Sequence, residues 1–270
     1  MVEKTELILA KDGIFPVTRD ENGILLPSIP ASGFSFSGTV QGEGKLNGIP
    51  SLFVRLAGCN LHCTWKMSDG RLVACDTAYA SFELKNTSKI PVEKIHRILR
   101  ANRDNIQHIV ITGGEPLLQA TPLIRLCSKL KEDEFHLTIE TNATLYDEEL
   151  ARYIDLFSLS PKLASSVNDS SGRERIRADY IQSYIDHCRK FEKDFQLKFV
   201  YSAENDVAEI KSLLSSLHGW KNEDILLMPL GADVETLRIN TQKTLAHCIR
   251  NGWRFCDRLH ISLFGTKDGV

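Results

Sequence analysis

The chain has 270 residues, 42% of them hydrophobic, so it can bury a sizeable core as one large domain or two small ones. Lys and Arg number 33 against 35 Asp and Glu, and this balance gives no reason to expect nucleic acid or an anionic membrane as a partner. No run of about 18 apolar residues is present, and the N-terminal residues lack the basic-then-apolar layout of a secretory signal. We therefore expect one cytoplasmic domain, which spans no membrane and acts on a small molecule.

The N-terminal segment, residues 1–38, contains two short apolar runs at residues 7–10 and 24–26. Asn22-Gly23 lies between them and is typical of a tight hairpin turn. Prolines and glycines follow as breakers of regular structure. We expect a hairpin or irregular arm over residues 1–38 and a core domain over residues 39–270.

Four residues at the start of that core, Gln41-Gly42-Glu43-Gly44, combine two glycines with an amide and a carboxylate. Glycine allows the backbone to approach a ligand closely, so this stretch is either a binding loop or an ordinary polar turn. Arg55 follows in the next apolar run. Its guanidinium could bind a substrate carboxylate through two hydrogen bonds, although a surface arginine at a strand end is the alternative.

Three of the seven cysteines, Cys59, Cys63 and Cys75, fall within 17 residues directly after the β-branched run at residues 51–56. Thiolates grouped at a strand end indicate a metal site. Three sulfur ligands suit zinc, with His62 as a possible fourth ligand, or an iron–sulfur cluster in which one of four irons has no protein ligand. The spacing alone leaves both possibilities open.

From residue 91 onward, apolar periodicity predicts alternating helices and strands. Helices are expected at residues 91–102, 117–130, 147–154, 179–195, 207–217 and 236–251. Strands are expected at residues 108–112, 136–140, 156–159, 197–201 and 225–228, with residues 259–264 as a last strand. Counting from residues 51–56, we expect about six of these segments to form a parallel sheet with helical crossovers, which predicts an open, partial parallel β/α barrel rather than a closed one. Residues 163–178 are too polar for a strand and are expected to form a long connection, with a lid as the alternative.

A glycine pair follows the strand at residues 108–112, in the sequence Gly113-Gly114-Glu115-Pro116. Exposed backbone and a carboxylate at a strand end could hold an ammonium group beside a metal cluster. This pattern favours the iron–sulfur cluster over zinc.

The motif GCNLHC, a third cysteine and TGGEP resemble the radical S-adenosylmethionine (SAM) superfamily, whose usual pattern is Cys-x3-Cys-x2-Cys. Removing residues 66–74 would restore that spacing, so we interpret these nine residues as an insertion. QGEG, FVRLAGCNLHC, CDTAYA, TGGEP, ETN, SPK and the C-terminal RLHISLFGTKDGV narrow the resemblance to the 7-carboxy-7-deazaguanine synthase family.

The resemblance implies a lyase that contracts 6-carboxy-5,6,7,8-tetrahydropterin to 7-carboxy-7-deazaguanine with loss of ammonia, on the route to queuosine and related 7-deazapurines. A [4Fe-4S] cluster on Cys59, Cys63 and Cys75 would cleave SAM to a 5′-deoxyadenosyl radical. Thr77 would help to hold Mg2+ with the substrate. The resemblance also implies an electron donor such as flavodoxin and a homodimer.

The same resemblance assigns positioning roles to further residues and no catalytic role beyond the cofactors. Gly114 and Glu115 would hold the methionine end of SAM. The adenosyl side would be lined by Ser160, Pro161, Lys162, Met228, Pro229, Leu230 and Gly231. The pterin would be bound by Val40, Gln41, Gly42, Glu43, Arg55, Thr112 and the carboxylate of Val270. Another radical SAM enzyme, such as a glycyl-radical activase or one acting on a different nucleoside precursor, and a noncatalytic zinc-binding module are the alternatives.

Overall fold

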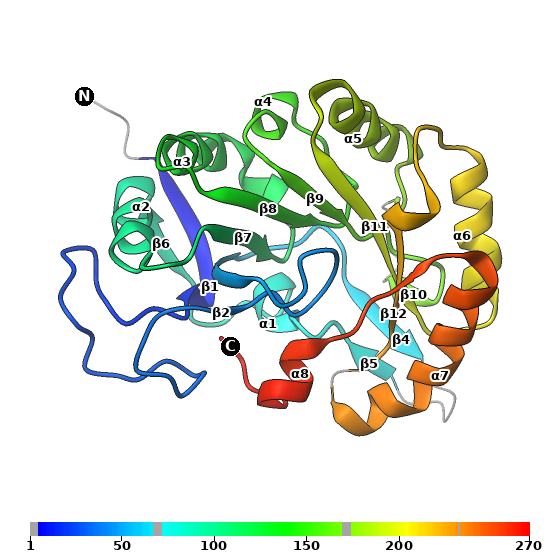
Figure 1. Cartoon of the computed structure of the whole chain (residues 1–270), viewed down its shortest axis with the longest axis horizontal. Helices are drawn as coiled ribbons and strands as arrows, with labels where there is room; N and C mark the ends of the chain where they lie inside the picture. The colour runs from blue at the N-terminus through cyan, green and yellow to red at the C-terminus, as the bar shows by residue number, and fades with distance from the viewer. Residues whose placement is uncertain (1–4, 67–71, 169–173, 232) are drawn as a thin grey trace.

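The computed structural model describes residues 5–66, 72–168, 174–231 and 233–270. One large sheet dominates the fold, with strand order β13-β12-β11-β9-β8-β7-β3-β1-β6 and β2 (Thr39–Val40) paired to β3 (Figure 1). From β13 to β3 every neighbouring pair is parallel. The predicted open, partial barrel with a mostly parallel sheet is therefore confirmed.

The parallel strands are β3 (Pro50–Leu56), β7 (His108–Gly113), β8 (His136–Thr141), β9 (Leu156–Leu159), β11 (Asp194–Tyr201), β12 (Ile225–Pro229) and β13 (Arg254–Phe255). The helices are α1 (Ala78–Ser81), α2 (Val92–Ala101), α3 (Ala120–Glu132), α4 (Glu148–Ala151), α5 (Ala178–Phe191), α6 (Asn205–Ser215), α7 (Val234–Asn251) and α8 (Leu259–Phe264), with short 3-10 turns η1 (Pro116–Gln119) and η2 (Asn222–Asp224). None of these described helices combines the length and apolar character needed to cross a bilayer.

Helices α2 to α7 lie along the outer side of the curved sheet, as Figure 1 shows. Their apolar stripes face it: in α2, for example, Val92, Ile95 and Leu99 are fully buried. The sheet contributes continuous apolar runs such as residues 109–111 of β7, in which Ile109 and Ile111 join the same core and Val110 packs with Phe15 and Phe53 in a separate cluster. Strands buried on both faces need such runs, which leaves the strand ends as the places for polar residues.

The sequence prediction is wrong at residues 192–195 and at residues 259–264. The helix expected at residues 179–195 ends at Phe191, because Glu192 adopts a left-handed conformation with φ of 54° and β11 then begins. Residues 259–264 form helix α8 rather than a strand. Their alternating apolar pattern resembles a strand, yet only Ile261 is buried, and the backbone N–H of Leu259 donates to Gly42 instead of to a sheet neighbour.

The N-terminal residues contribute directly to the main sheet. Strand β1 (Glu6–Phe15) pairs antiparallel with both β3 and β6 (Ser88–Pro91). The turn predicted at Asn22-Gly23 is present, with Arg19 bridged to Leu25 across it. The apolar run at residues 7–10 thus pairs with β3 and β6 rather than with residues 24–26. A boundary between an arm and a core at residue 38 stays a proposal.

A second, small sheet has the order β10-β4-β5, with β4 (Cys63–Lys66), β5 (Leu72–Ala74) and β10 (Ser166–Asn168) all antiparallel. The insertion predicted at residues 66–74 lies partly outside the described residues, and its described ends extend the β4–β5 pair. Residues 163–178, of which 169–173 also lie outside, were expected to contain no strand. That prediction is wrong for β10. The backbone N–H and C=O groups at the edge of β4 pair with those of residues 166–168, and such pairing does not require apolar side chains.

Candidate active site

A cavity of about 400 Å3 opens at the carboxyl ends of the parallel strands. Every residue that the sequence analysis placed in a binding site lines it, except Glu115 and Pro161. Parallel strands bring their carboxyl ends to one edge, which explains how motifs from distant parts of the chain meet there.

The three clustered cysteines, Cys59, Cys63 and Cys75, all line this cavity. Cys59 follows β3, whereas Cys63 begins β4 and Cys75 follows β5, and the N–H of Cys75 donates to the Cys63 carbonyl at 3.0 Å. The β4–β5 pair therefore brings the third cysteine back beside the second despite eleven intervening residues.

These thiols have the chemistry expected of cluster ligands. Burial, opposed by the charge of Lys162 and assisted by the charges of Cys75 and Cys59, raises the pKa of Cys63 to about 12. Burial likewise raises the pKa of Cys59 and of Cys75. Thiols in such surroundings become thiolates when a positively charged metal centre takes the place of their protons. The donor set therefore fits an iron–sulfur cluster. Within the described chain, no three His, Cys, Asp or Glu side chains are grouped for a single metal ion.

The glycine pair of TGGEP packs backbone against backbone beside the first cysteine. A Cβ on Gly113 would lie 2.1 Å from the Leu56 carbonyl oxygen, and one on Gly114 would lie 2.2 Å from that of Gly58. The N–H of Glu115 donates to the same Gly58 oxygen at 2.8 Å. Only glycine fits these two positions, and the close approach holds the loop that carries Cys59 against the end of β7.

Glu115 is fully buried and does not line the cavity. Its carboxylate accepts hydrogen bonds from the N–H groups of Leu117 and Asn142, at 3.0 and 2.8 Å, and from the Thr141 hydroxyl. These donors occupy the carboxylate, so its observed contacts join the ends of β7 and β8. The predicted contact of Glu115 with SAM stays a prediction.

Lys162 extends toward the cysteines from the segment after β9. Its Nζ donates to the Ser160 hydroxyl at 2.9 Å, and both residues line the cavity. The Lys162 charge acts on all three thiols, lowering the pKa of each. The SPK motif thus places a cation at the cysteine side of the cavity, whereas Pro161 between these residues lies outside the lining.

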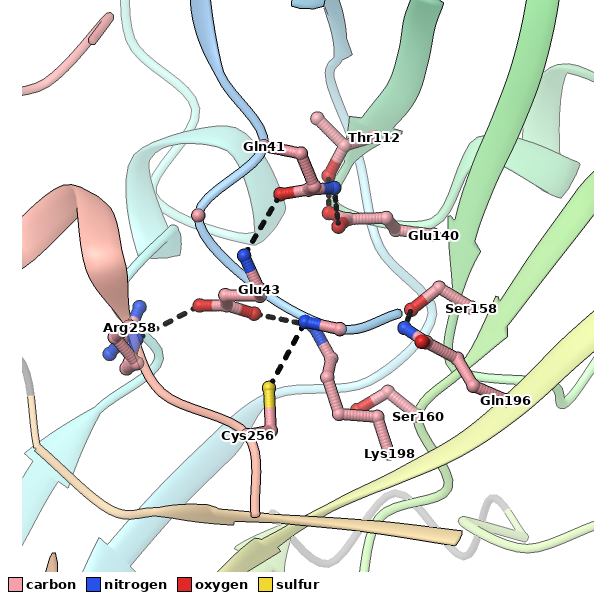
Figure 2. A network of polar contacts seen from close by, with 12 residues as sticks. Gln41, Glu43, Thr112, Glu140, Ser158, Ser160, Gln196, Lys198, Cys256 and Arg258 are labelled. Atoms are coloured by element: carbon pink, nitrogen blue, oxygen red, sulfur yellow. Dashed lines mark hydrogen bonds and ion pairs between the residues drawn. The ribbon is translucent and has the colours of Figure 1, made fainter. Parts of the chain in front are cut away.

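The cavity lining also includes a polar network built on the QGEG loop (Figure 2). The Gln41 amide donates to the Glu140 carboxylate at 3.2 Å, and the Thr112 hydroxyl donates to the same carboxylate at 2.8 Å. The N–H of Glu43 donates to the Gln41 side chain at 3.2 Å. These bonds orient Gln41 and Thr112, two predicted substrate residues, around a carboxylate from β8.

Glu43 is held between two cations, Lys198 of β11 and Arg258, which directly precedes α8 (Figure 2). Burial alone would raise the pKa of Glu43, but the charges of Lys198 and Arg258 outweigh this effect and lower it. The Glu43 carboxylate is therefore ionised, and its two oxygens pair with Lys198 and Arg258. Gly42 is equally constrained, since a Cβ there would lie 2.4 Å from the His260 ring.

Arg55 reaches the cavity from β3 and is oriented from β1. Its Nε donates to Asp12 at 2.6 Å, and the Tyr79 hydroxyl donates to the same carboxylate oxygen at 2.8 Å. Arg55 also stacks over the Phe15 ring, 5.1 Å from its centroid. The N-terminal strand therefore fixes the direction of the guanidinium.

Thr77 and Val270 line the same cavity. The Thr77 hydroxyl lies 3.3 Å from the Cys75 sulfur. Residues 265–270 run along the rim, where Asp268 pairs with Lys11 at 2.7 Å. His260 of α8 also lines the cavity.

Five charged residues that line the cavity or contact its lining received no role from the sequence: Asp12, Asp76, Glu140, Lys198 and Arg258. Glu140 and Lys198 carried a usable signal, because a charged residue within an otherwise apolar strand is rarely buried without a partner. Asp12 and Arg258 carried none, since their importance depends on strand pairing and on α8, which the sequence pattern did not predict.

Comparison with known proteins agrees with this geometry. The Radical SAM superfamily model matches residues 54–195. The 7-carboxy-7-deazaguanine synthase of Halobacterium salinarum is 33% identical over 251 residues, covering 88% of this chain and 91% of the relative. That of Rhodopirellula baltica is 31% identical over 235 residues, covering 85% of each chain. The crystal structure of QueE from Escherichia coli shares the fold, with a TM-score of 0.64 at 20% identity over 94% of this chain and 95% of that one.

The cysteine-lined cavity, the partial barrel and these relatives lead to the same assignment, which replaces the zinc-binding alternative. The chain belongs to the radical SAM superfamily and, within it, to the 7-carboxy-7-deazaguanine synthase family.

Proposed function

We propose that this protein catalyses the reaction of its family, the contraction of 6-carboxy-5,6,7,8-tetrahydropterin to 7-carboxy-7-deazaguanine with loss of ammonia, in queuosine and 7-deazapurine biosynthesis. The observation that carries the proposal is a single cavity lined by both the three cysteines and the polar QGEG loop. Cofactor ligands and substrate-binding groups must face one space if a radical formed at one is to react at the other.

The cofactors are a [4Fe-4S] cluster and SAM, as membership of the superfamily implies. When bound, they supply the one-electron chemistry that starts the reaction. We place the cluster on Cys59, Cys63 and Cys75. The protein's own contribution is to bind, orient and shield, because its side chains offer no redox chemistry of this kind.

For SAM, we propose the cysteine side of the cavity, where Gly114, Ser160, Lys162 and residues 228–231 form the lining. The glycine pair exposes backbone there for an ammonium group. Glu115 lies outside the cavity lining and supports the glycine pair by joining the end of β7 to Thr141 and to the loop after β8.

For the pterin, we propose the wall formed by residues 40–43, Arg55, Thr112 and Val270. Arg55 uses its Nε on Asp12, and the structure records no bond from its two terminal nitrogens among the described residues. Two parallel N–H groups directed into a cavity match a carboxylate, which this substrate carries.

Magnesium belongs to the same proposal, on Thr77. Its hydroxyl, a substrate carboxylate and waters would satisfy the octahedral, oxygen-based preference of Mg2+. Flavodoxin, or a similar protein, is proposed as the electron donor, and a homodimer as the assembly.

The test is to incubate anaerobically reconstituted protein with SAM, dithionite, Mg2+ and carboxytetrahydropterin, and to detect the product by mass spectrometry. We expect 7-carboxy-7-deazaguanine to form with equimolar ammonia. A Cys75→Ala variant, treated identically, provides the background. Cleavage of SAM without any deazapurine would show that the substrate is a different one, whereas no SAM cleavage at all would contradict the radical mechanism.

A further inference from the structure

One guanidinium, that of Arg258, bonds to three separate loops around the cavity. Its Nε donates to the Glu43 carboxylate at 2.9 Å, its Nη2 pairs with the Asp76 carboxylate, and its Nη1 donates to the Gly231 carbonyl. The side chain is 9% exposed. Figure 2 shows Arg258 directed at Glu43 from the segment that leads into α8.

Each partner belongs to a different part of the proposed site. Glu43 lies in the QGEG loop on the pterin side, and Asp76 stands between Cys75 and Thr77. Gly231 follows β12 in the segment assigned to SAM. All three lie beyond the ends of strands, where the hydrogen bonds of the sheet do not fix the backbone.

The planar guanidinium suits this arrangement, because its N–H groups point in several fixed directions, whereas an ammonium group is a compact point charge. The carboxylates of Glu43 and Asp76 would also repel each other without the positive charge of Arg258. The other nearby cation, Lys198, does not replace it, because Lys198 pairs with Glu43 and not with Asp76. Three of the five N–H groups of Arg258, one on each nitrogen, have protein partners, so the loops that it joins fix the orientation of its guanidinium.

We propose that Arg258 is a positioning residue that holds the loops carrying Glu43, Asp76 and Gly231 in fixed positions relative to one another. Its loss would therefore weaken the binding of both pterin and SAM. This inference rests on the proposed function and deepens it. A residue that touched the pterin alone would affect only the pterin, and a purely structural residue would affect only stability.

The variants are Arg258→Met, which keeps much of the side-chain volume without the donors, and Arg258→Lys, which keeps the charge. Arg189→Met is the matched control: Arg189 also bonds one carboxylate, Asp224, and one glycine carbonyl, that of Gly219, at 2.7 Å each, but lies outside the cavity lining. All proteins are reconstituted with iron and sulfide under anaerobic conditions.

The measurements are iron per chain, the melting temperature, the Kd for SAM by calorimetry and the KM for the pterin. For Arg258→Met we expect the SAM Kd and the pterin KM both to rise, by about tenfold or more each, since charged hydrogen bonds that fix two loops are lost. Arg258→Lys should recover part of both effects, and Arg189→Met should lower the melting temperature without changing either constant.

A rise in the pterin KM alone would identify Arg258 as a direct substrate ligand and overturn the proposal. A fall in melting temperature with unchanged SAM Kd would overturn it in favour of a structural role. If Arg258→Met does not fold, Arg258→Lys decides between the same outcomes. Failure of the wild-type protein to convert the pterin would reject the proposed function, whereas the SAM Kd and the iron content would still report on Arg258.

Discussion

Replacing Gly114 by alanine should damage the fold and the cluster site together. The new Cβ would lie 2.2 Å from the carbonyl oxygen of Gly58 and 2.9 Å from that of Ala80, and both are backbone atoms. The N–H of Gly58 donates to that Ala80 oxygen at 2.7 Å, so the contacts lie within a hydrogen-bonded junction. To admit the methyl group, the loop preceding Cys59 must move away from the end of β7.

The magnitude follows from the steric contact alone, because the φ angle of Gly114 is not in the left-handed region. Overpacking typically costs ~1–3 kcal/mol, and a rigid backbone neighbour places this case at about 3 kcal/mol. For a domain of this size, that corresponds to a melting temperature lower by roughly 6–12 °C. Gly48→Ala is the control, since Gly48 has a φ of +90° but nothing within 4 Å of a new Cβ. It should cost only ~1 kcal/mol from backbone strain.

Both variants would be measured by thermal unfolding of the metal-free protein and by iron content after reconstitution. We expect Gly114→Ala to unfold at a clearly lower temperature than Gly48→Ala and to bind less iron, whereas Gly48→Ala keeps its full iron content. A Gly114→Ala protein that matches Gly48→Ala in both measurements would refute the steric argument.

Three further predictions address the ligands, the orientation of Arg55 and a buried histidine. Cys75→Ala should reconstitute with less iron and lose SAM cleavage; full iron content and activity would remove Cys75 from the ligand set. Asp12→Asn should raise the KM for the pterin by about tenfold and leave the Kd for SAM unchanged, because it removes the charge that orients Arg55; equal changes in both constants would show that Asp12 acts on the whole cavity. His108 is buried, and burial together with the charge of His136 lowers its pKa to about 4, below the ordinary value of about 6.5. The unfolded chain therefore binds more protons than the folded one between those pH values, so stability falls as the pH drops through this window, by about 2 kcal/mol between about pH 7 and 5. Denaturant unfolding of His108→Gln should show a smaller loss over that interval, and an identical loss would assign the effect to other groups.

The sequence alone predicted those features that depend on local pattern. Apolar runs and helical periodicity identified the parallel strands from β3 to β12 and the crossover helices, but not β13, since burial on one or both faces dictates which positions are apolar. Gly113 and Gly114 were recognisable because only glycine permits such close backbone contact. The grouping of Cys59 and Cys63 after a strand likewise indicated metal chemistry, because thiolates close together in the chain can share one metal centre.

The structure was needed wherever long-range contacts override local pattern. Residues 259–264 alternate like a strand, yet they form α8 because the chain has left the sheet and packs on the QGEG loop instead. Glu115 had the position of a ligand-binding carboxylate, but donors from β8 and the loop after it occupy it. Only strand pairing places Asp12 behind Arg55, and only tertiary packing brings Glu43, Asp76 and Gly231 to a single guanidinium. Such contacts join residues far apart in the chain, and no periodicity within one segment can encode them.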